Sequence, residues 1–246
     1  NEKNRRKRLN DLSIKWKDFY KNVFALVVPM ALQNLINVGV TAADVVMLGK
    51  VSEKVLSGAS LAGQIQYIMV LFLFGLTSGA TVLTAQYWGK GDKTAIEKIL
   101  ALGIRSAVIV TAIFTIAAFT IPASLMRIFT NDPQVIAEGV KYLRIVACSY
   151  IIMGITNVYL YVMRSIERVI VATVVYLVSF LCNVVFNAIF IFGLFGFPAL
   201  GIRGAAIATL IARIMELVLV CGYAKIYNKD VKFRVHYFLH QDKLLV

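Results

Sequence analysis

The chain has 246 residues, of which 59% are hydrophobic and only 16% are charged, and its Lys and Arg residues give a net charge of +13. Soluble domains are nearer to about 45–50% apolar, so the composition argues against an ordinary soluble domain. No basic fold with interleaved aromatic residues accompanies the positive charge, which argues against nucleic acid as a partner.

Six apolar segments follow one another along the chain. Each reaches or exceeds the ~20 residues with which a helix crosses the hydrocarbon core of a bilayer. Because lipid offers backbone groups no hydrogen-bond partner, such segments form α-helices. We therefore predict an all-α, polytopic membrane protein, a six-transmembrane-helix bundle whose helices span residues 23–48, 55–87, 99–121, 140–163, 169–195 and 202–223.

The connecting segments carry unequal numbers of basic residues. Most of the 26 Lys and Arg lie in residues 1–18 and shortly after them, in the loops after the second and fourth helices, and beyond residue 224. By the positive-inside rule, both termini lie in the cytoplasm. We expect a basic cytoplasmic tail over 1–18, a membrane lobe over 19–227 and a cytoplasmic connector over 228–246, in a multi-pass protein of the plasma (inner) membrane.

Two short polar motifs predict how helices begin. Asp92 follows a glycine turn and can accept hydrogen bonds from the free N–H groups of the next helix. Asp132 is followed by Pro133, a residue that is favoured at the first position of a helix. We expect both aspartates to cap helices.

The first apolar segment carries polar side chains where lipid penalises them. A carboxylate inside a membrane span costs about 2.5–3.5 kcal/mol on insertion scales, so it usually faces protein or a wet cavity and serves function. At about 100° per residue, Gln33, Asn37, Thr41 and Asp44 share one helix face. Pro29 removes a backbone hydrogen bond within the same helix and predicts a hinge there.

Later helices add polar residues at comparable depths in the membrane. Asp44, Asn183, Asn187, Thr209 and Tyr142 could together surround one wet cavity. Arg213 and Glu216 are three residues apart on one helix and can pair; Glu216 could instead be a second proton site. The alternative is a purely structural role, in which polar groups only form hydrogen bonds between helices. It applies best to Asn157, Tyr176 and Ser179.

Motifs in chain order resemble the multidrug and toxic compound extrusion (MATE) family of transporters. The resemblance covers residues 19–227 and is carried by Pro29-x3-Gln33-Asn34 with Asp44 and Gly49, Gly75-Leu-Thr-Ser-Gly-Ala-Thr, Ala85-Gln86-Tyr-Trp-Gly-Lys-Gly-Asp92, Phe129-Thr-Asn-Asp-Pro with Tyr142-Leu-Arg, Asn183-x3-Asn187, and Gly201-Ile-Arg-Gly-Ala-Ala-Ile-Ala-Thr209.

This resemblance implies one lobe of a twelve-helix transporter, with a C-terminal six-helix lobe missing from this chain. It implies a secondary active antiporter that exports small cationic or amphiphilic molecules across the bilayer in exchange for H⁺ or Na⁺, with no other cofactor. It also implies a cation-binding or proton-coupling site formed by Asp44, Asn183, Asn187, Thr209 and Tyr142. Asp44 is then the coupling carboxylate, and Na⁺ binding is possible at Asp44, Asn183 and Asn187. In the branch of the family that has this cation site, the second of the two polar positions on the fifth helix is commonly Asp. In this chain that position is Asn187.

Three alternatives remain at this point. A lipid-precursor flippase should line its cavity with several cations for a pyrophosphate, and only Arg213 and Arg105 are candidates. An intramembrane enzyme would need paired carboxylates, a metal cluster or a nucleophile with a base, and we predict no enzyme and no metal site. A non-transporting membrane subunit would show no dependence on a counter-ion.

Overall fold

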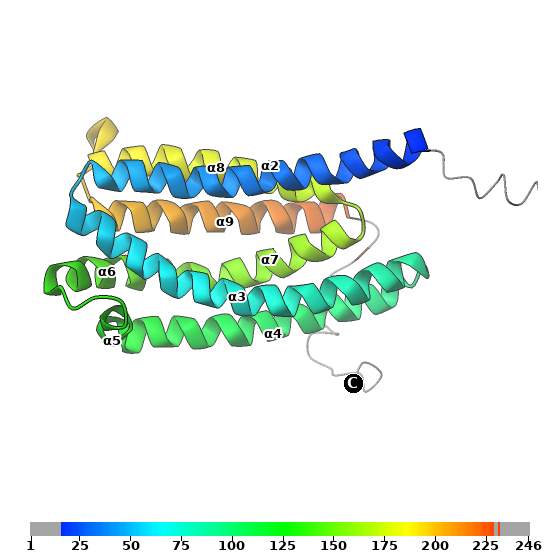
Figure 1. The fold of residues 1–246 in the computed structure, drawn as a ribbon, viewed down its shortest axis with the longest axis horizontal. Helices are drawn as coiled ribbons and strands as arrows, with labels where there is room; N and C mark the ends of the chain where they lie inside the picture. The colour runs from blue at the N-terminus through cyan, green and yellow to red at the C-terminus, as the bar shows by residue number, and fades with distance from the viewer. Residues whose placement is uncertain (1–15, 229–230, 232–246) are drawn as a thin grey trace, which may run out of the picture.

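The computed structural model describes residues 16–228 and Val231, and over these residues the chain consists of helices joined by short loops (Figure 1). The helices are α2 (Trp16–Gly49), α3 (Glu53–Gly89), α4 (Lys93–Thr120), α5 (Pro122–Arg127), α6 (Pro133–Val146), α7 (Tyr150–Ser165), α8 (Val169–Phe192) and α9 (Ile202–Ile226), with short 3₁₀ turns η1 (Ala147–Ser149) and η2 (Leu194–Gly196). Among the described residues, 6 helical spans are long and apolar enough to cross a membrane. The prediction of an all-α, six-helix membrane bundle is confirmed.

The fourth predicted span differs most from the sequence-based expectation. Residues 140–163 were expected to form one helix. In the structure this span begins at Pro133, and η1 divides it into α6 and α7. Hydroxyl groups bond carbonyls around the break: Thr115 Oγ1 donates to the carbonyl of Ala147 at 3.3 Å, and Ser149 Oγ to that of Val146 at 2.7 Å. Such side-chain donors make an irregular turn tolerable within a membrane span.

Several helix ends also lie elsewhere than predicted. α2 begins at Trp16 and α4 at Lys93, because polar residues continue both helices beyond their apolar parts. α8 ends at Phe192 and not at residue 195, since Gly193 adopts a left-handed conformation with φ of 74° and ends the helix. The short helix α5 was not predicted. Of the predicted tail and connector, residues 1–15, 229–230 and 232–246 lie outside the described residues.

Both predicted caps are present. Asp92 accepts a hydrogen bond from the backbone N–H of Ala95 at 3.0 Å. Asp132 accepts hydrogen bonds from the backbone N–H groups of Gln134 and Val135. Lys54 on α3 also donates to the Asp132 carboxylate, and this hydrogen bond is the main reason that the pKa of Asp132 is lowered.

The helices form two groups, which meet where α9 packs on α6 and α7. α2 packs on α8, which packs on α9, while α3 packs on α4 and α6, and α4 on α7 (Figure 1). Close helix contacts occur at small residues, as is usual in membranes. A Cβ on Gly58 would lie 2.8 Å from the backbone N of Gly139, and one on Gly204 would lie 2.5 Å from the carbonyl oxygen of Phe190.

Candidate functional site

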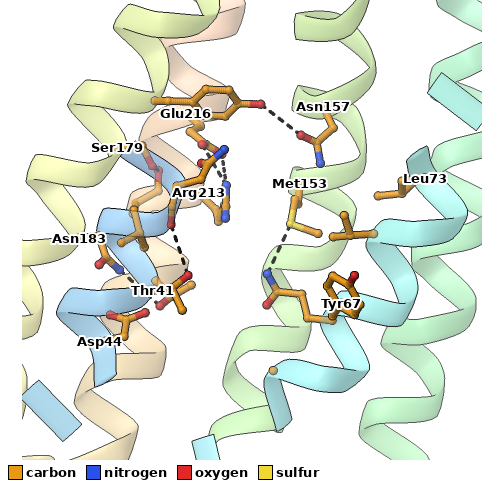
Figure 2. A pocket seen from close by; sticks show the side chains of 18 of the residues that line it. Thr41, Asp44, Tyr67, Leu73, Met153, Asn157, Ser179, Asn183, Arg213 and Glu216 are labelled. Atoms are coloured by element: carbon orange, nitrogen blue, oxygen red, sulfur yellow. Dashed lines mark hydrogen bonds and ion pairs between the residues drawn. The ribbon is translucent and has the colours of Figure 1, made fainter. Parts of the chain in front are cut away.

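A cavity of about 780 Å³ lies between the two helix groups. Its walls come from α2, α8 and α9 on one side and from α3, α6 and α7 on the other, and Figure 2 shows their side chains facing one another across it. The charged residues among its lining are Asp44, Arg164, Arg213 and Glu216. Four ionisable groups on one membrane-embedded surface indicate a functional cavity, since such groups are costly in a bilayer.

Asp44 lies on the cavity wall near the end of α2 and is held by a chain of amides. Asn187 on α8 donates from Nδ2 to Asp44 Oδ1 at 2.5 Å and to Asn183 Oδ1 at 3.0 Å. Asn183 in turn donates from Nδ2 to Thr209 Oγ1 on α9 at 3.5 Å. The chain of hydrogen bonds therefore joins α2, α8 and α9 and ends at one carboxylate. A change in the charge of Asp44 would alter hydrogen bonds that connect these three helices.

Tyr142 completes the set of residues that were predicted to come together. It lies on α6, lines the cavity, and interacts through its hydroxyl with Thr209 and with the charge of Asp44. An apolar cluster that includes Leu48, Ile191 and Ile202 packs against it. The five residues, which were expected from four segments of the sequence, thus meet at one end of the cavity.

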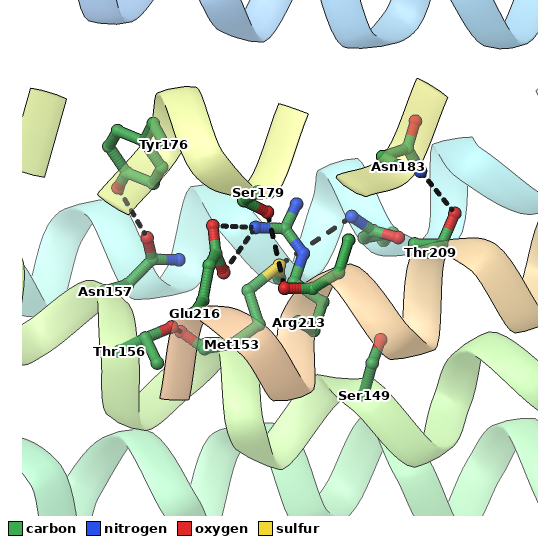
Figure 3. Close-up of polar contacts among 12 residues, drawn as sticks. Ser149, Met153, Thr156, Asn157, Tyr176, Ser179, Asn183, Thr209, Arg213 and Glu216 are labelled. Atoms are coloured by element: carbon green, nitrogen blue, oxygen red, sulfur yellow. Dashed lines mark hydrogen bonds and ion pairs between the residues drawn. The ribbon is translucent and has the colours of Figure 1, made fainter. Parts of the chain in front are cut away.

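Arg213 and Glu216 form the predicted pair in the middle of the cavity (Figure 3). Nη1 of Arg213 donates to both carboxylate oxygens of Glu216 at 2.9 Å, and the Glu216 side chain is only 1% exposed. Next to this pair, the Tyr176 hydroxyl donates to Asn157 Oδ1 at 3.4 Å and Ser179 Oγ to the carbonyl of Ala212 at 3.4 Å. These are the helix-to-helix bonds expected for Asn157, Tyr176 and Ser179.

The polar face of α2 divides between the cavity and the helix interface. Asn37 and Thr41 line the cavity together with Asp44. Gln33 was expected there too, but it lies outside the cavity, buried against α8, where its Nε2 donates to the carbonyl of Val169 and to Thr173 Oγ1. It shares the helix face of Asp44, but at its level α8 covers that face.

Pro29 lies inside α2, which remains helical from Trp16 to Gly49. Thr173 Oγ1 on α8 donates to the Pro29 carbonyl at 3.5 Å and accepts a hydrogen bond from Gln33 at 2.8 Å. The proline is therefore held against α8 by a small polar cluster, fifteen residues before Asp44 along the same helix.

Sequence reasoning missed two groups of cavity residues. Ser60, Gln64 and Tyr67 on α3 line the cavity, and their spacing of three to four residues is a signal that could have found them. Arg164 was counted among the cytoplasmic loop charges, but it lines the cavity from the last turn of α7. Arg105, a candidate cavity cation, does not line it.

The residues around Asp44 have the chemistry to hold a small cation. The Asp44 carboxylate, the Thr209 hydroxyl and the amide oxygens of Asn183 and Asn187 are hard oxygen ligands. Oδ1 of Asn187 is buried and accepts no hydrogen bond. A buried acceptor without a donor is costly, and a proton shared with Asp44 or a Na⁺ ion would each satisfy it.

Comparison with known proteins finds a matching family model and several relatives. The MatE family model matches residues 29–189. A relative from Thermotoga maritima called "Probable multidrug resistance protein NorM" is 28% identical over 78% of this chain and 42% of the relative. A protein of the same name from Rhizobium meliloti is 27% identical over 85% of this chain and 45% of the relative. The chain spans about half the length of these curated relatives.

Solved structures share the fold. A structure described as "Crystal structure of MATE in the bent conformation" superposes with a TM-score of 0.81 at 19% identity, over 90% of this chain and 49% of the other. A second, described as an "Outward-facing conformation of a multidrug resistance MATE family transporter of the MOP superfamily", gives a TM-score of 0.80 at 19% identity over 90% and 48%. The helix arrangement described above is therefore the one that these proteins share.

Proposed function

The chain belongs to the MatE family, and from this premise we propose that the intact protein is a secondary active antiporter that exports organic cations and amphiphilic drugs. The coupling ion is H⁺ or Na⁺, and Asp44 is the coupling carboxylate. The names of the relatives support drug export, and the cavity supports a small-molecule substrate because about 780 Å³ is in the range of sites for drug-sized ligands.

One observation carries this proposal: a membrane-embedded carboxylate faces the cavity and is bonded through two amides to two other helices. Proton uptake by Asp44 removes the negative charge that Nδ2 of Asn187 faces. A Na⁺ ion would instead recruit Asp44 with the oxygens of Asn183 and Asn187, and Thr209 and Tyr142 are placed to add hydroxyl groups. Either event changes the bonding between α2 and α8.

Coupling follows if ion and drug favour different arrangements of α2. We assign the hinge to Pro29, because no backbone N–H is available there to hold the preceding turn. When Asp44 is neutralised, α2 repacks on α8 beyond the hinge, and the cavity wall made by Asn37 and Thr41 moves with it. A drug that binds more strongly while Asp44 is charged then dissociates.

The architecture of the intact protein belongs to the same proposal. A second six-helix lobe faces the cavity and completes it, since the relatives are about twice as long as this chain. The protein lies in the plasma membrane with both ends of this lobe in the cytoplasm, as the distribution of basic residues predicts. The alternative of a lipid-precursor flippase is disfavoured because a pyrophosphate calls for several cations: Arg213 is neutralised by Glu216, which leaves Arg164 as the one other cation among the described residues that line the cavity.

The test is Asp44→Asn in the intact protein, reconstituted in liposomes and supplied with a fluorescent cationic dye under separate H⁺ and Na⁺ gradients. We expect dye binding to persist and gradient-driven transport to fall to the level of empty liposomes. Glu53→Gln, which removes an exposed carboxylate outside the cavity, is the matched control and should transport normally. Gradient-driven transport by Asp44→Asn would refute the role of Asp44.

A further inference from the structure

Arg164 is a cation in the cavity that the mechanism above does not use. It belongs to the last turn of α7, and it lines the cavity. Its guanidinium carbon lies 4.7 Å from the ring centroid of Tyr161 and 5.7 Å from that of Tyr176. These distances are within the ~6 Å of a cation–π contact, so two aromatic rings hold the guanidinium in place.

The guanidinium has no counter-charge among residues 16–228. Its Nε–H is buried without a hydrogen-bond partner, and its contacts within that part of the chain are the two tyrosine rings. Arg213, the other cavity arginine, is instead bonded to both oxygens of Glu216. Two arginines that line one cavity therefore differ in kind: one is neutralised internally and the other is available to a ligand.

Asp44 and Arg164 lie at opposite ends of the cavity. Asp44 is bonded to Asn187, and Arg164 contacts Tyr176, eleven residues earlier on α8. At 1.5 Å per residue, these two anchor points are roughly 16 Å apart. Figure 2 shows Asp44 at one end of the pocket and Asn157, the partner of Tyr176, at the other. With the Arg213–Glu216 pair neutral, the cavity is negative at one end and positive at the other.

A simpler account is that Arg164 reaches from a helix end toward lipid headgroups, as long basic side chains often do. Its position argues against this account. The side chain is partly buried, its Nε is fully buried, and both of its contacts are cavity tyrosines. The neighbouring Arg168, at the start of α8, is exposed and does not line the cavity.

We propose that Arg164, with Tyr161 and Tyr176, forms a subsite for the anionic group of the substrate, a carboxylate or a phosphate. This inference rests on the proposed function and assigns residues to the two ends of a zwitterionic amphiphile, whose cationic part faces Asp44 and whose acidic part faces Arg164. The guanidinium offers a planar pair of N–H donors that match the two oxygens of a carboxylate, and the tyrosine rings receive the aromatic body next to it.

The test compares two dyes that differ in one charge, rhodamine B with its free carboxylate and the ethyl ester of rhodamine B. Affinities are measured by fluorescence polarisation with the intact protein in detergent without added lipid, so that no lipid phosphate supplies the anion. The readout is the ratio of the two dissociation constants, because the dyes also differ in hydrophobicity. We expect Arg164→Gln to shift this ratio against the acid by about tenfold, with the affinity for the ester unchanged.

Two further variants separate the loss of a ligand contact from a general effect. Arg164→Lys keeps the charge but loses the planar pair of donors, so its ratio should fall between those of the wild type and Arg164→Gln. Arg127→Gln removes an exposed cation outside the cavity and should leave the ratio unchanged.

Each other outcome overturns the proposal. Equal weakening of both dyes by Arg164→Gln would show that Arg164 supports the cavity wall or pairs with another part of the intact protein. An unchanged ratio, together with ester transport that still depends on Asp44, would remove the anion subsite and leave the proposed function intact. Failure of the wild-type protein to bind either dye would remove both the export of organic cations and the subsite.

Discussion

At the residue scale, the amide at position 187 determines how many carboxylates the proposed cation site contains. Asn187 donates to Asp44 and leaves its own Oδ1 without a donor. Asp44 is thus the only carboxylate in the hydrogen-bonded set that joins α2, α8 and α9 among the described residues. A single carboxylate with amide oxygens binds a monovalent cation less strongly than a pair of carboxylates does, because less negative charge balances the ion.

Asn187→Asp tests this argument. A second carboxylate beside Asp44 repels the first unless a cation lies between them, so we expect Na⁺ to bind this variant more strongly than the wild type. The measurement is the melting temperature of the purified intact protein in NaCl and in choline chloride, since a ligand of the folded state raises it. The Na⁺-dependent increase should be larger in Asn187→Asp and absent in Asp44→Asn. Equal increases in all three proteins would contradict a Na⁺ site at Asp44.

At the scale of the elements, the contact between α8 and α9 depends on the absence of a side chain. Gly204, in the first turn of α9, lies directly against the carbonyl of Phe190, and a Cβ there would approach its oxygen to 2.5 Å. Backbone atoms of a packed helix cannot move aside as the end of a flexible side chain can. Asn183 and Thr209 bond each other across the same helix pair, so this contact also sets the geometry of the site.

Two glycine-to-alanine substitutions on α9 should have opposite signs. Gly204→Ala should lower the free energy of unfolding by about 1–3 kcal/mol through overpacking, or by roughly 2–4 °C in melting temperature per kcal/mol for a chain of this size. A Cβ on Gly222 would meet no atom within 4 Å, so Gly222→Ala should stabilise α9 by up to about 1 kcal/mol. The melting temperatures of both purified variants in detergent check this. Equal changes in melting temperature would show that the close contact of Gly204 with α8 does not determine the cost of an added side chain.

At the scale of the whole molecule, the cavity predicts where water reaches the interior of the lobe. Ser60 on α3 is exposed and lines the cavity, whereas Ile113 on α4 is 61% exposed and lies on an apolar surface away from it. In the proposed transporter, the first position meets water and substrate, and the second meets lipid.

Cysteine labelling distinguishes the two surfaces. In the intact protein without its native cysteines, Ser60→Cys should react with a membrane-impermeant maleimide in liposomes, and the ethyl ester of rhodamine B should slow the reaction. Ile113→Cys should not react under the same conditions, because lipid excludes the charged reagent. If Ile113→Cys reacts as fast as Ser60→Cys, the face assigned to lipid is exposed to water and the arrangement proposed for the membrane is wrong.

The outline of the site could be predicted from sequence, but its limits could not. Helical spacing placed Gln33 on the same face as Asp44, yet only the position of α8 shows that Gln33 is covered while Asn37 and Thr41 are open to the cavity. Arg164 illustrates the opposite error. Its position at the end of an apolar span is typical of a loop charge, and the direction of its side chain depends on Tyr161 and Tyr176.

The sequence by itself determined the class of fold and the membrane environment, because long apolar runs leave the backbone no alternative to helices in lipid. It also determined which polar residues would be costly there, and hence Asp44 as the first candidate for function. Only the tertiary structure decided which of these residues share one cavity, that Arg213 is neutralised while Arg164 is not, and where the fourth span breaks. These properties depend on contacts between helices distant in the chain, and periodicity within one helix does not contain them.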